Sequence, residues 1–139
     1  MRSTTEHREI EFKFRIPADL TINIGDILES IHHTGEPLDH RSMDATYYDT
    51  ASLSLIRWGV TLRRRSGGGG DGWHMKLPLR YSEAGAPEHG MDEIHVDGTA
   101  SLIPSPLVSI ASPLIRNQEL VPVARVMTER SPFLVRDDP

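Results

Sequence analysis

The N-terminal stretch HREIEFKFRIP alternates apolar and charged residues at every second position from Arg8 onward. The apolar positions are Ile10, Phe12, Phe14 and Ile16, and the charged positions are Glu9, Glu11, Lys13 and Arg15. A two-residue period is typical of a β-strand, so we predict a strand from Arg8 to Ile16 that Pro17 ends. This strand would carry two carboxylates and two cations on a single face.

The remaining hydrophobic pattern divides into helical and extended segments. Apolar residues at three- and four-residue spacing predict a helix from about Ile24 to His32, and a short helix follows Asp49 or Thr50, either of which can cap it. Three prolines interrupt residues 101–119, where we expect one or two short helical pieces. Further strands are predicted at about 39–48, 60–65, 73–78, 91–96, 120–129 and 133–136.

A glycine run from Gly67 to Gly70 joins two of these strands and predicts a flexible hairpin connection. No Gly-Lys-Ser/Thr sequence follows it, so it is not the phosphate loop of P-loop proteins. Residues 81–90 form a second predicted loop. With six or seven strands, mostly antiparallel, and two or three helices, the pattern predicts an α+β domain.

The composition narrows the class of protein. A chain of 139 residues with 37% hydrophobic and 25% charged residues fits one globular domain. Its formal net charge of −5 argues against general nucleic-acid binding, and the absence of cysteine excludes disulfides and thiolate metal sites. No apolar run approaches the ~20 residues that span a bilayer, and the N-terminus has no apolar signal core. We therefore expect a cytoplasmic protein without membrane attachment.

Charged residues recur on alternate positions of several predicted strands. Arg63 and Arg65 share one face of their strand, and His74 and Lys76 share one face of the next, while Glu93 lies on a third. For a single strand, a solvated polar face is the ordinary explanation. Because most of these faces combine acids with Arg or Lys, we favour a curved or closed sheet with charges inside and helices outside. Such charges need partners, and a polyanion with a divalent cation would supply them.

These segments resemble the CYTH domain, the family of triphosphate tunnel metalloenzymes that includes thiamine triphosphatases, inorganic triphosphatases and one class of adenylate cyclases. Glu9-x-Glu11-x-Lys13 is similar to the family's ExExK signature. YYDT....LIRWGVTLRRR, which ends at Arg65, is similar to its Tyr-aromatic-Asp-Thr, helix, Gly and Leu-Arg-x-Arg block. GWHMKLP and PVARVMTER resemble later strands, and the resemblance covers roughly residues 6–136.

The resemblance implies one domain over residues 1–139, built as an antiparallel β-barrel or tunnel with a charged lumen and helices packed outside. The metal-binding acids that it implies, for Mg²⁺ or Mn²⁺, are Glu9, Glu11 and Glu93. The catalytic and phosphate-gripping cations that it implies are Lys13, Arg63, Arg65 and Lys76, and the further substrate-binding cations are Arg15, Arg125 and Arg130. Related sequences usually continue past the position of Pro139 through further strands. We therefore expect a C-terminally incomplete barrel, whose open strand edges would allow association, for example as a homodimer.

Three functions remain open. The favoured one is a metal-dependent triphosphatase acting on inorganic triphosphate or on an organic triphosphate such as thiamine triphosphate. The second is a non-catalytic module that binds polyphosphate or a nucleotide. The third is a class IV-type adenylate cyclase, for which no nucleotide-specific feature is present. His74, on the same predicted strand face as Lys76, could also contact phosphate, although a structural role is its ordinary explanation.

Overall fold

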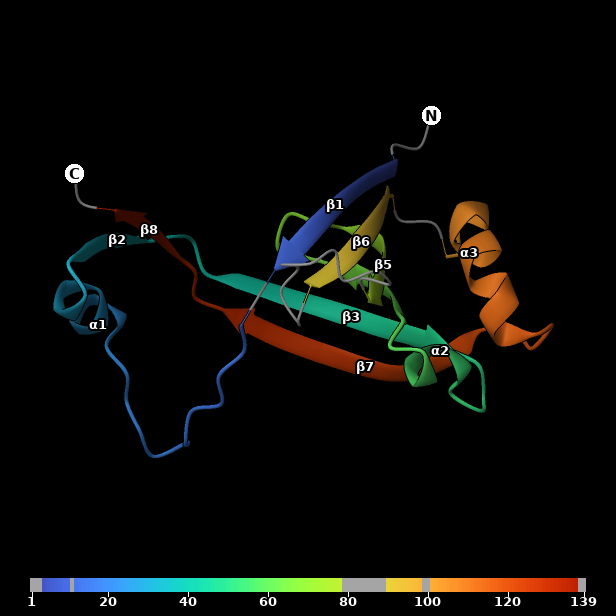
Figure 1. Ribbon diagram of the computed structural model, residues 1–139, viewed down its shortest axis with the longest axis horizontal. Helices are drawn as coiled ribbons and strands as arrows, with labels where there is room; N and C mark the ends of the chain where they lie inside the picture. The colour runs from blue at the N-terminus through green and yellow to red at the C-terminus, as the bar shows by residue number, and fades with distance from the viewer. Residues whose placement is uncertain (1–3, 11, 79–89, 99–100, 138–139) are drawn as a thin grey trace, which may run out of the picture. The chain divides into compact units, whose positions relative to one another are not determined.

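The computed structural model describes residues 4–10, 12–78, 90–98 and 101–137 (Figure 1); for residues 4–10, 90 and 137 we describe the backbone alone. The chain divides into two compact units. The first comprises Met1–Phe12 and Met43–Thr128, and the second comprises Lys13–Ser42 and Glu129–Pro139.

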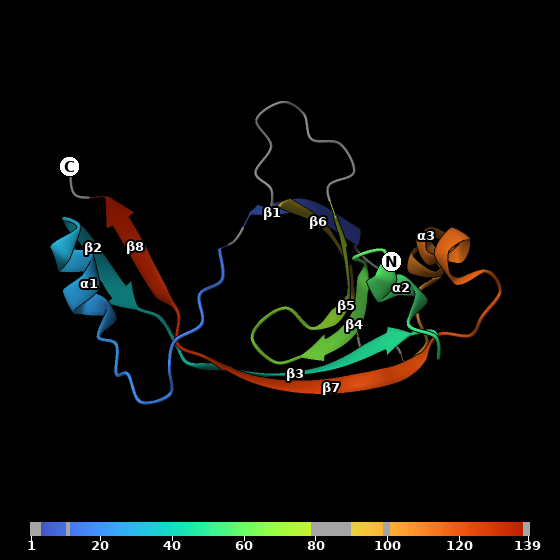
Figure 2. The same ribbon diagram turned by 60° about the horizontal axis from the view of Figure 1, so that its bottom comes forward.

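A curved, six-stranded sheet forms the frame of the first unit. Its strands are β1 (Thr4–Ile10), β3 (Arg41–Asp49), β4 (Thr61–Ser66), β5 (Gly72–Pro78), β6 (Gly90–Asp97) and β7 (Val121–Arg130). They lie in the order β1-β6-β5-β4-β3-β7, and the pairs β1–β6, β6–β5, β5–β4 and β4–β3 are antiparallel. Figure 2 shows β3 and β7 on one arm of the curve, β1 and β6 on the other, and α2 (Ser54–Arg57) and α3 (Ser105–Ile115) on its outer side.

The outer side of the sheet carries the hydrophobic core. Leu55 of α2 and Leu107 of α3 are fully buried against Leu62, Trp73 and Met75 of the central strands. These strand residues occupy alternate positions, so the period of two that predicted the strands also separates a core side from a polar side. The helices thus pack against the apolar side of these strands.

A carboxylate at the end of β3 organises α2. Asp49 is buried, and its Oδ1 accepts hydrogen bonds from the backbone N–H groups of Thr50 (2.7 Å) and Leu55 (2.8 Å). Its Oδ2 accepts one from the N–H of Ile56 at 3.1 Å, and Thr50 Oγ1 accepts one from the N–H of Ser54 at 2.9 Å. The predicted cap is confirmed, because these bonds satisfy N–H groups of the first helical turn.

The second unit combines α1 (Ile24–Ser30) with an antiparallel pair, β2 (His33–Pro37) and β8 (Phe133–Asp137). The side chain of Asn23 caps α1 by accepting from the N–H of Gly25 at 3.0 Å. The predicted helix is confirmed, whereas β2 was not predicted. In this unit, the carboxylate of Glu129 accepts a hydrogen bond from Ser42 Oγ, and its Oε2 lies 2.6 Å from His40 Nε2.

One local expectation was wrong, because the first strand does not continue to Ile16. β1 spans Thr4–Ile10, residues 12–17 form no strand, and Phe14 is 85% exposed. The proline-rich segment forms a single helix, within the expectation of one or two helical pieces. Its 11 residues are continuous because Pro106 lies in the first turn and Pro113 only two residues before the end. The predicted loop at 81–90 lies almost wholly outside the described residues.

The α+β class with antiparallel pairing is confirmed, but the described residues do not close a barrel. Their sheet is open, with β1 and β7 as its two edges. The sheet is nevertheless curved, as Figure 2 shows, and this curvature is its tunnel-like feature. Within the described part of the chain, no helix is long and apolar enough to cross a membrane.

We expect Asp49→Ala to lower the free energy of unfolding by about 2–4 kcal/mol, because three N–H groups near the start of α2 lose their acceptor. Urea denaturation followed by circular dichroism measures this change. Arg57→Ala, an exposed position at the end of the same helix, is the control and should change stability by less than about 0.5 kcal/mol. Equal effects of the two substitutions would contradict the capping role.

Candidate functional site

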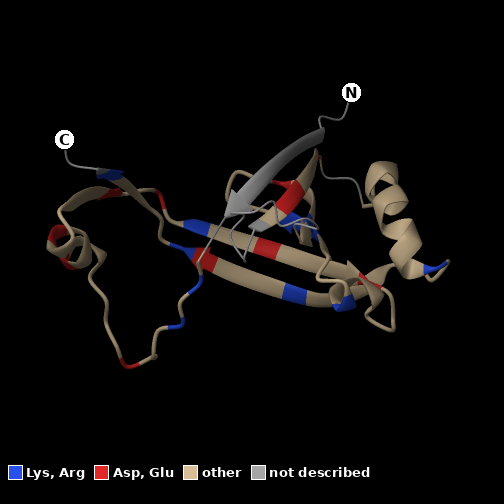
Figure 3. Cartoon of the chain, viewed as in Figure 1, with Lys and Arg blue, Asp and Glu red and all other residues tan. Residues whose placement is uncertain are grey.

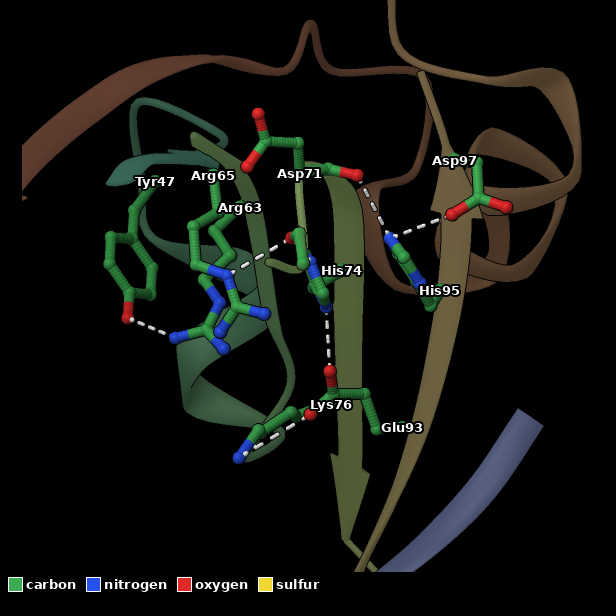
Figure 4. Close-up of polar contacts among 10 residues, drawn as sticks. Tyr47, Arg63, Arg65, Asp71, His74, Lys76, Glu93, His95 and Asp97 are labelled. Atoms are coloured by element: carbon green, nitrogen blue, oxygen red, sulfur yellow. Dashed lines mark hydrogen bonds and ion pairs between the residues drawn. The ribbon is translucent and has the colours of Figure 1, made fainter. Parts of the chain in front are cut away.

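Polar side chains from four neighbouring strands gather on the inner side of the curved sheet. The register pairs Tyr47 with Arg63, Arg63 with His74, and His74 with His95. Residues that face each other across antiparallel strands project to the same side, here the side opposite the core. We call this surface the polar face; its members are Tyr47, Arg63, Arg65, His74, Lys76, Glu93 and His95 (Figure 4).

The carboxylate of Glu93 lies at the centre of the polar face. Its side chain is 7% exposed, with Oε1 2.6 Å from His74 Nδ1 and Oε2 3.5 Å from Lys76 Nζ. The hydrogen bond from His74 is the largest cause that lowers the pKa of Glu93 from its ordinary value near 4.5 to about 2. The charges of Lys76 and Arg63 lower this pKa further, while burial opposes them. Glu93 is therefore an anion over the whole physiological pH range.

Both ring nitrogens of His74 contact hydrogen-bond acceptors. Its Nε2 lies 2.8 Å from the carbonyl oxygen of Gly70, and its Nδ1 lies 2.6 Å from Oε1 of Glu93. The ring is thus held at both nitrogens, between the β4–β5 turn and β6. The His95 ring stacks on it with centroids 4.2 Å apart.

Two arginines of β4 extend the polar face towards β3 and the hairpin turn. Arg63 Nη1 donates to Tyr47 Oη at 3.3 Å, whereas its buried Nε has no hydrogen-bond partner among the described residues. Arg65 Nε donates at 3.2 Å to Gly70 O, the same oxygen that His74 contacts. A buried guanidinium N–H without an acceptor is costly, and an anion lying over the face would satisfy it.

The structure brings together four of the site residues predicted from the sequence, Arg63, Arg65, Lys76 and Glu93. Another four lie elsewhere in the chain. Three of these belong to the second unit, namely Lys13, Arg15 and Arg130. The fourth, Arg125, belongs to the first unit but lies off the polar face.

Arg125 of β7 is engaged on the core side of the sheet. It pairs with Asp44 of β3 through Nε–Oδ1 (2.9 Å) and Nη2–Oδ2 (2.6 Å), and Figure 3 shows acidic and basic segments on both of these neighbouring strands. Asp44 is paired with Ser66 of β4. Ser66 lies on the same side of that strand as Arg64 and Leu62, and on the opposite side from Arg63. A substrate contact of Arg125 remains a prediction that this pairing does not favour.

Two predicted metal ligands cannot be assessed from side chains. Glu11 lies outside the described residues, and Glu9 is described by its backbone alone, opposite Met91 in the β1–β6 ladder. Among the described residues, no group of three or more His, Asp or Glu side chains could hold a metal ion. Since both oxygens of Glu93 already face basic side chains, the described side chains alone do not form a metal site.

Sequence reasoning missed the partners that organise the face, above all the bridge from Gly70 through His74 to Glu93. The alternation in HMK placed His74 on the side of Lys76, which was the available signal. What the sequence did not contain was the register of β5 against β6. That register places His95 opposite His74 and Glu93 opposite Lys76, within reach of the imidazole.

Comparison with known proteins gives a family and two relatives. The family model described as "CYTH domain" matches residues 7–138. "Uncharacterized protein Rv2226" of Mycobacterium tuberculosis (strain ATCC 25618 / H37Rv) and "Uncharacterized protein MT2285" of strain CDC 1551 / Oshkosh are each 33% identical to this chain over 125 residues. The match covers 89% of this chain but 23% of either relative, so the chain spans about a quarter of their length.

The lowered pKa of Glu93 predicts an acid-sensitive contribution to stability. The ionised carboxylate stabilises the fold above its unfolded pKa near 4.5, and this stabilisation is lost as the pH falls through that value towards about 2. Urea unfolding between about pH 6 and about pH 2 should therefore show a steeper decline for the wild type than for Glu93→Gln. Parallel pH profiles would show that the interaction contributes no stability.

Proposed function

This chain belongs to the CYTH domain family, and we propose that its polar face binds the phosphate groups of a triphosphate and promotes their metal-dependent hydrolysis. CYTH domains bind triphosphates, and the family generally depends on divalent metal ions. The names of the two relatives state no activity, so the assignment is argued from the family and from the geometry of the polar face.

The buried N–H of Arg63 is the observation that carries the proposal. Its guanidinium stands between Tyr47 and the basic side chains of β5, with one donor unpaired in the part of the chain that the structure describes. Phosphate oxygens are suitable acceptors for a planar guanidinium, which can donate two parallel hydrogen bonds. Arg65 and Lys76 lie on the same face and supply further positive charge for neighbouring phosphate groups.

We assign the roles as follows. Arg63, Arg65 and Lys76 bind the phosphates and stabilise the charge that develops during transfer. Phosphate contacts of Lys13, Arg15 and Arg130 remain predictions from the family resemblance. Glu9 and Glu11 are the residues that would hold Mg²⁺ or Mn²⁺, which when bound neutralises phosphate charge and orients a water molecule. Glu93 is treated separately below.

A second candidate function is a module that binds polyphosphate or a nucleotide without hydrolysing it. The observation that favours this candidate is the engagement of Glu93, which leaves the described part of the polar face without an open carboxylate. Cations alone suffice for binding anions, whereas hydrolysis also needs an activated water molecule. Adenylate cyclase activity has no specific observation in its favour and enters only as an outcome of the assay.

We expect phosphate release from inorganic triphosphate, thiamine triphosphate or ATP to require Mg²⁺ or Mn²⁺ and to be abolished by Glu11→Gln. A colorimetric phosphate assay with and without EDTA measures it, and calorimetry measures binding in parallel. Binding without release would favour the non-catalytic module, and formation of cyclic AMP would favour the cyclase. No saturable binding of triphosphate or polyphosphate would exclude the polar face as a phosphate site.

Arg63→Ala should lower kcat/KM for the triphosphate that is turned over by about 10²–10³-fold, since it removes a charge-assisted contact to the transferred group. Arg64→Ala is the matched control, because Arg64 is the next residue of β4 but projects to the other side of the sheet. We expect the control to remain within about threefold of the wild type once thermal melting has shown that both variants are folded. Comparable losses in both variants would argue against a site on the polar face.

A further inference from the structure

Glu93 is enclosed by basic side chains. Its Oε1 lies 2.6 Å from His74 Nδ1, and its Oε2 lies 3.5 Å from the ammonium of Lys76. The guanidinium of Arg63 is near enough to lower its pKa. The side chain is almost completely withdrawn from solvent, so water does not screen these charges effectively.

This enclosure opposes a metal ion at Glu93. A divalent cation bound to Oε2 would lie within a few ångströms of the Lys76 ammonium and the His74 ring, and like charges in a poorly solvated site repel strongly. Metal-bound carboxylates are normally accompanied by other carboxylates, carbonyls or neutral imidazoles. Around Glu93, the described side chains within hydrogen-bond or ion-pair distance are instead the Lys76 ammonium and the His74 ring, whose other nitrogen contacts Gly70 O.

We propose that Glu93 is a positioning residue and not a metal ligand: it is the internal counter-ion that fixes Lys76 and His74 on the polar face, ready for an anionic ligand. His74 holds Oε1 in place because its other nitrogen is anchored to Gly70 O. The contact with His74 restricts rotation of the Glu93 side chain, so that Oε2 points towards Lys76. The ammonium has three donors, so it can keep Glu93 and still donate to phosphate.

This inference rests on the proposed function, because positioning has meaning only if the polar face binds phosphate. It differs from the expectation drawn from the family resemblance, which makes Glu93 an acid of the metal site. The two roles predict different behaviour of Glu93→Gln towards metal. They also predict different behaviour of Lys76 when no metal is present.

The first test measures Mn²⁺ binding by the electron paramagnetic resonance signal of the free ion. We expect Glu93→Gln to keep the wild-type affinity within about twofold, while Glu11→Gln weakens it about tenfold or more. A loss in Glu93→Gln as large as that in Glu11→Gln would overturn the inference.

The second test is a double-mutant cycle for inorganic triphosphate binding in EDTA. We expect Lys76→Met to weaken binding about tenfold in the wild-type background and less than about threefold in the Glu93→Gln background, since the ammonium there has lost its orientation. Additive effects of the two substitutions would overturn the inference.

The third test needs no ligand. Nitrogen-15 NMR of the His74 ring should show two N–H groups in the wild type, and the Nδ1–H signal should be lost in Glu93→Gln. A ring with a single N–H would overturn the inference even if no variant folds. With both N–H groups present, a wild type that binds no triphosphate would overturn the proposed function and, with it, the positioning role, while leaving the ion pair itself established.

Discussion

The curved sheet can hold several cations on one side only because a carboxylate stands among them. The basic side chains of Arg63, Lys76 and His74 come from two adjacent strands, and repulsion between the positive charges of Arg63 and Lys76 disfavours close packing. Glu93 contributes from the next strand and bonds to two of these side chains at once. The pairing ties β5 to β6 through side chains as well as through the ladder. The polar face therefore depends on one residue for its charge balance.

The same strands contribute residues both to the hydrophobic core and to the polar face. In β4, Leu62 enters the core beneath α2 and α3 while its neighbour Arg63 projects to the polar face. Because side chains alternate with a period of two, a register slip of one residue would exchange these positions. The core thus does more than stabilise the sheet. By fixing Leu62, Trp73 and Met75 against the helices, it determines which side the arginines occupy.

Local patterns in the sequence were sufficient for much of this arrangement. Alternation located the central strands, the Asp49 cap was visible as a short polar sequence before a helix, and the shared side of Arg63 and Arg65 followed from their spacing. Pairings between distant residues were not visible. Arg125 and Asp44 are 81 residues apart in sequence, and their ion pair depends on how β7 lies beside β3.

The glycine-rich turn between β4 and β5 has a consequence for how this protein can diverge. Hairpin tips of low complexity are usually places where insertions and deletions accumulate without harm. Here the carbonyl oxygen of Gly70 lies within hydrogen-bond distance of both His74 and Arg65, so its position relative to these two side chains is constrained. Length variation is tolerable among Gly67, Gly68 and Gly69 only while the Gly70 carbonyl keeps its place. Homologues that differ in length beyond Gly70 should therefore also have replaced His74.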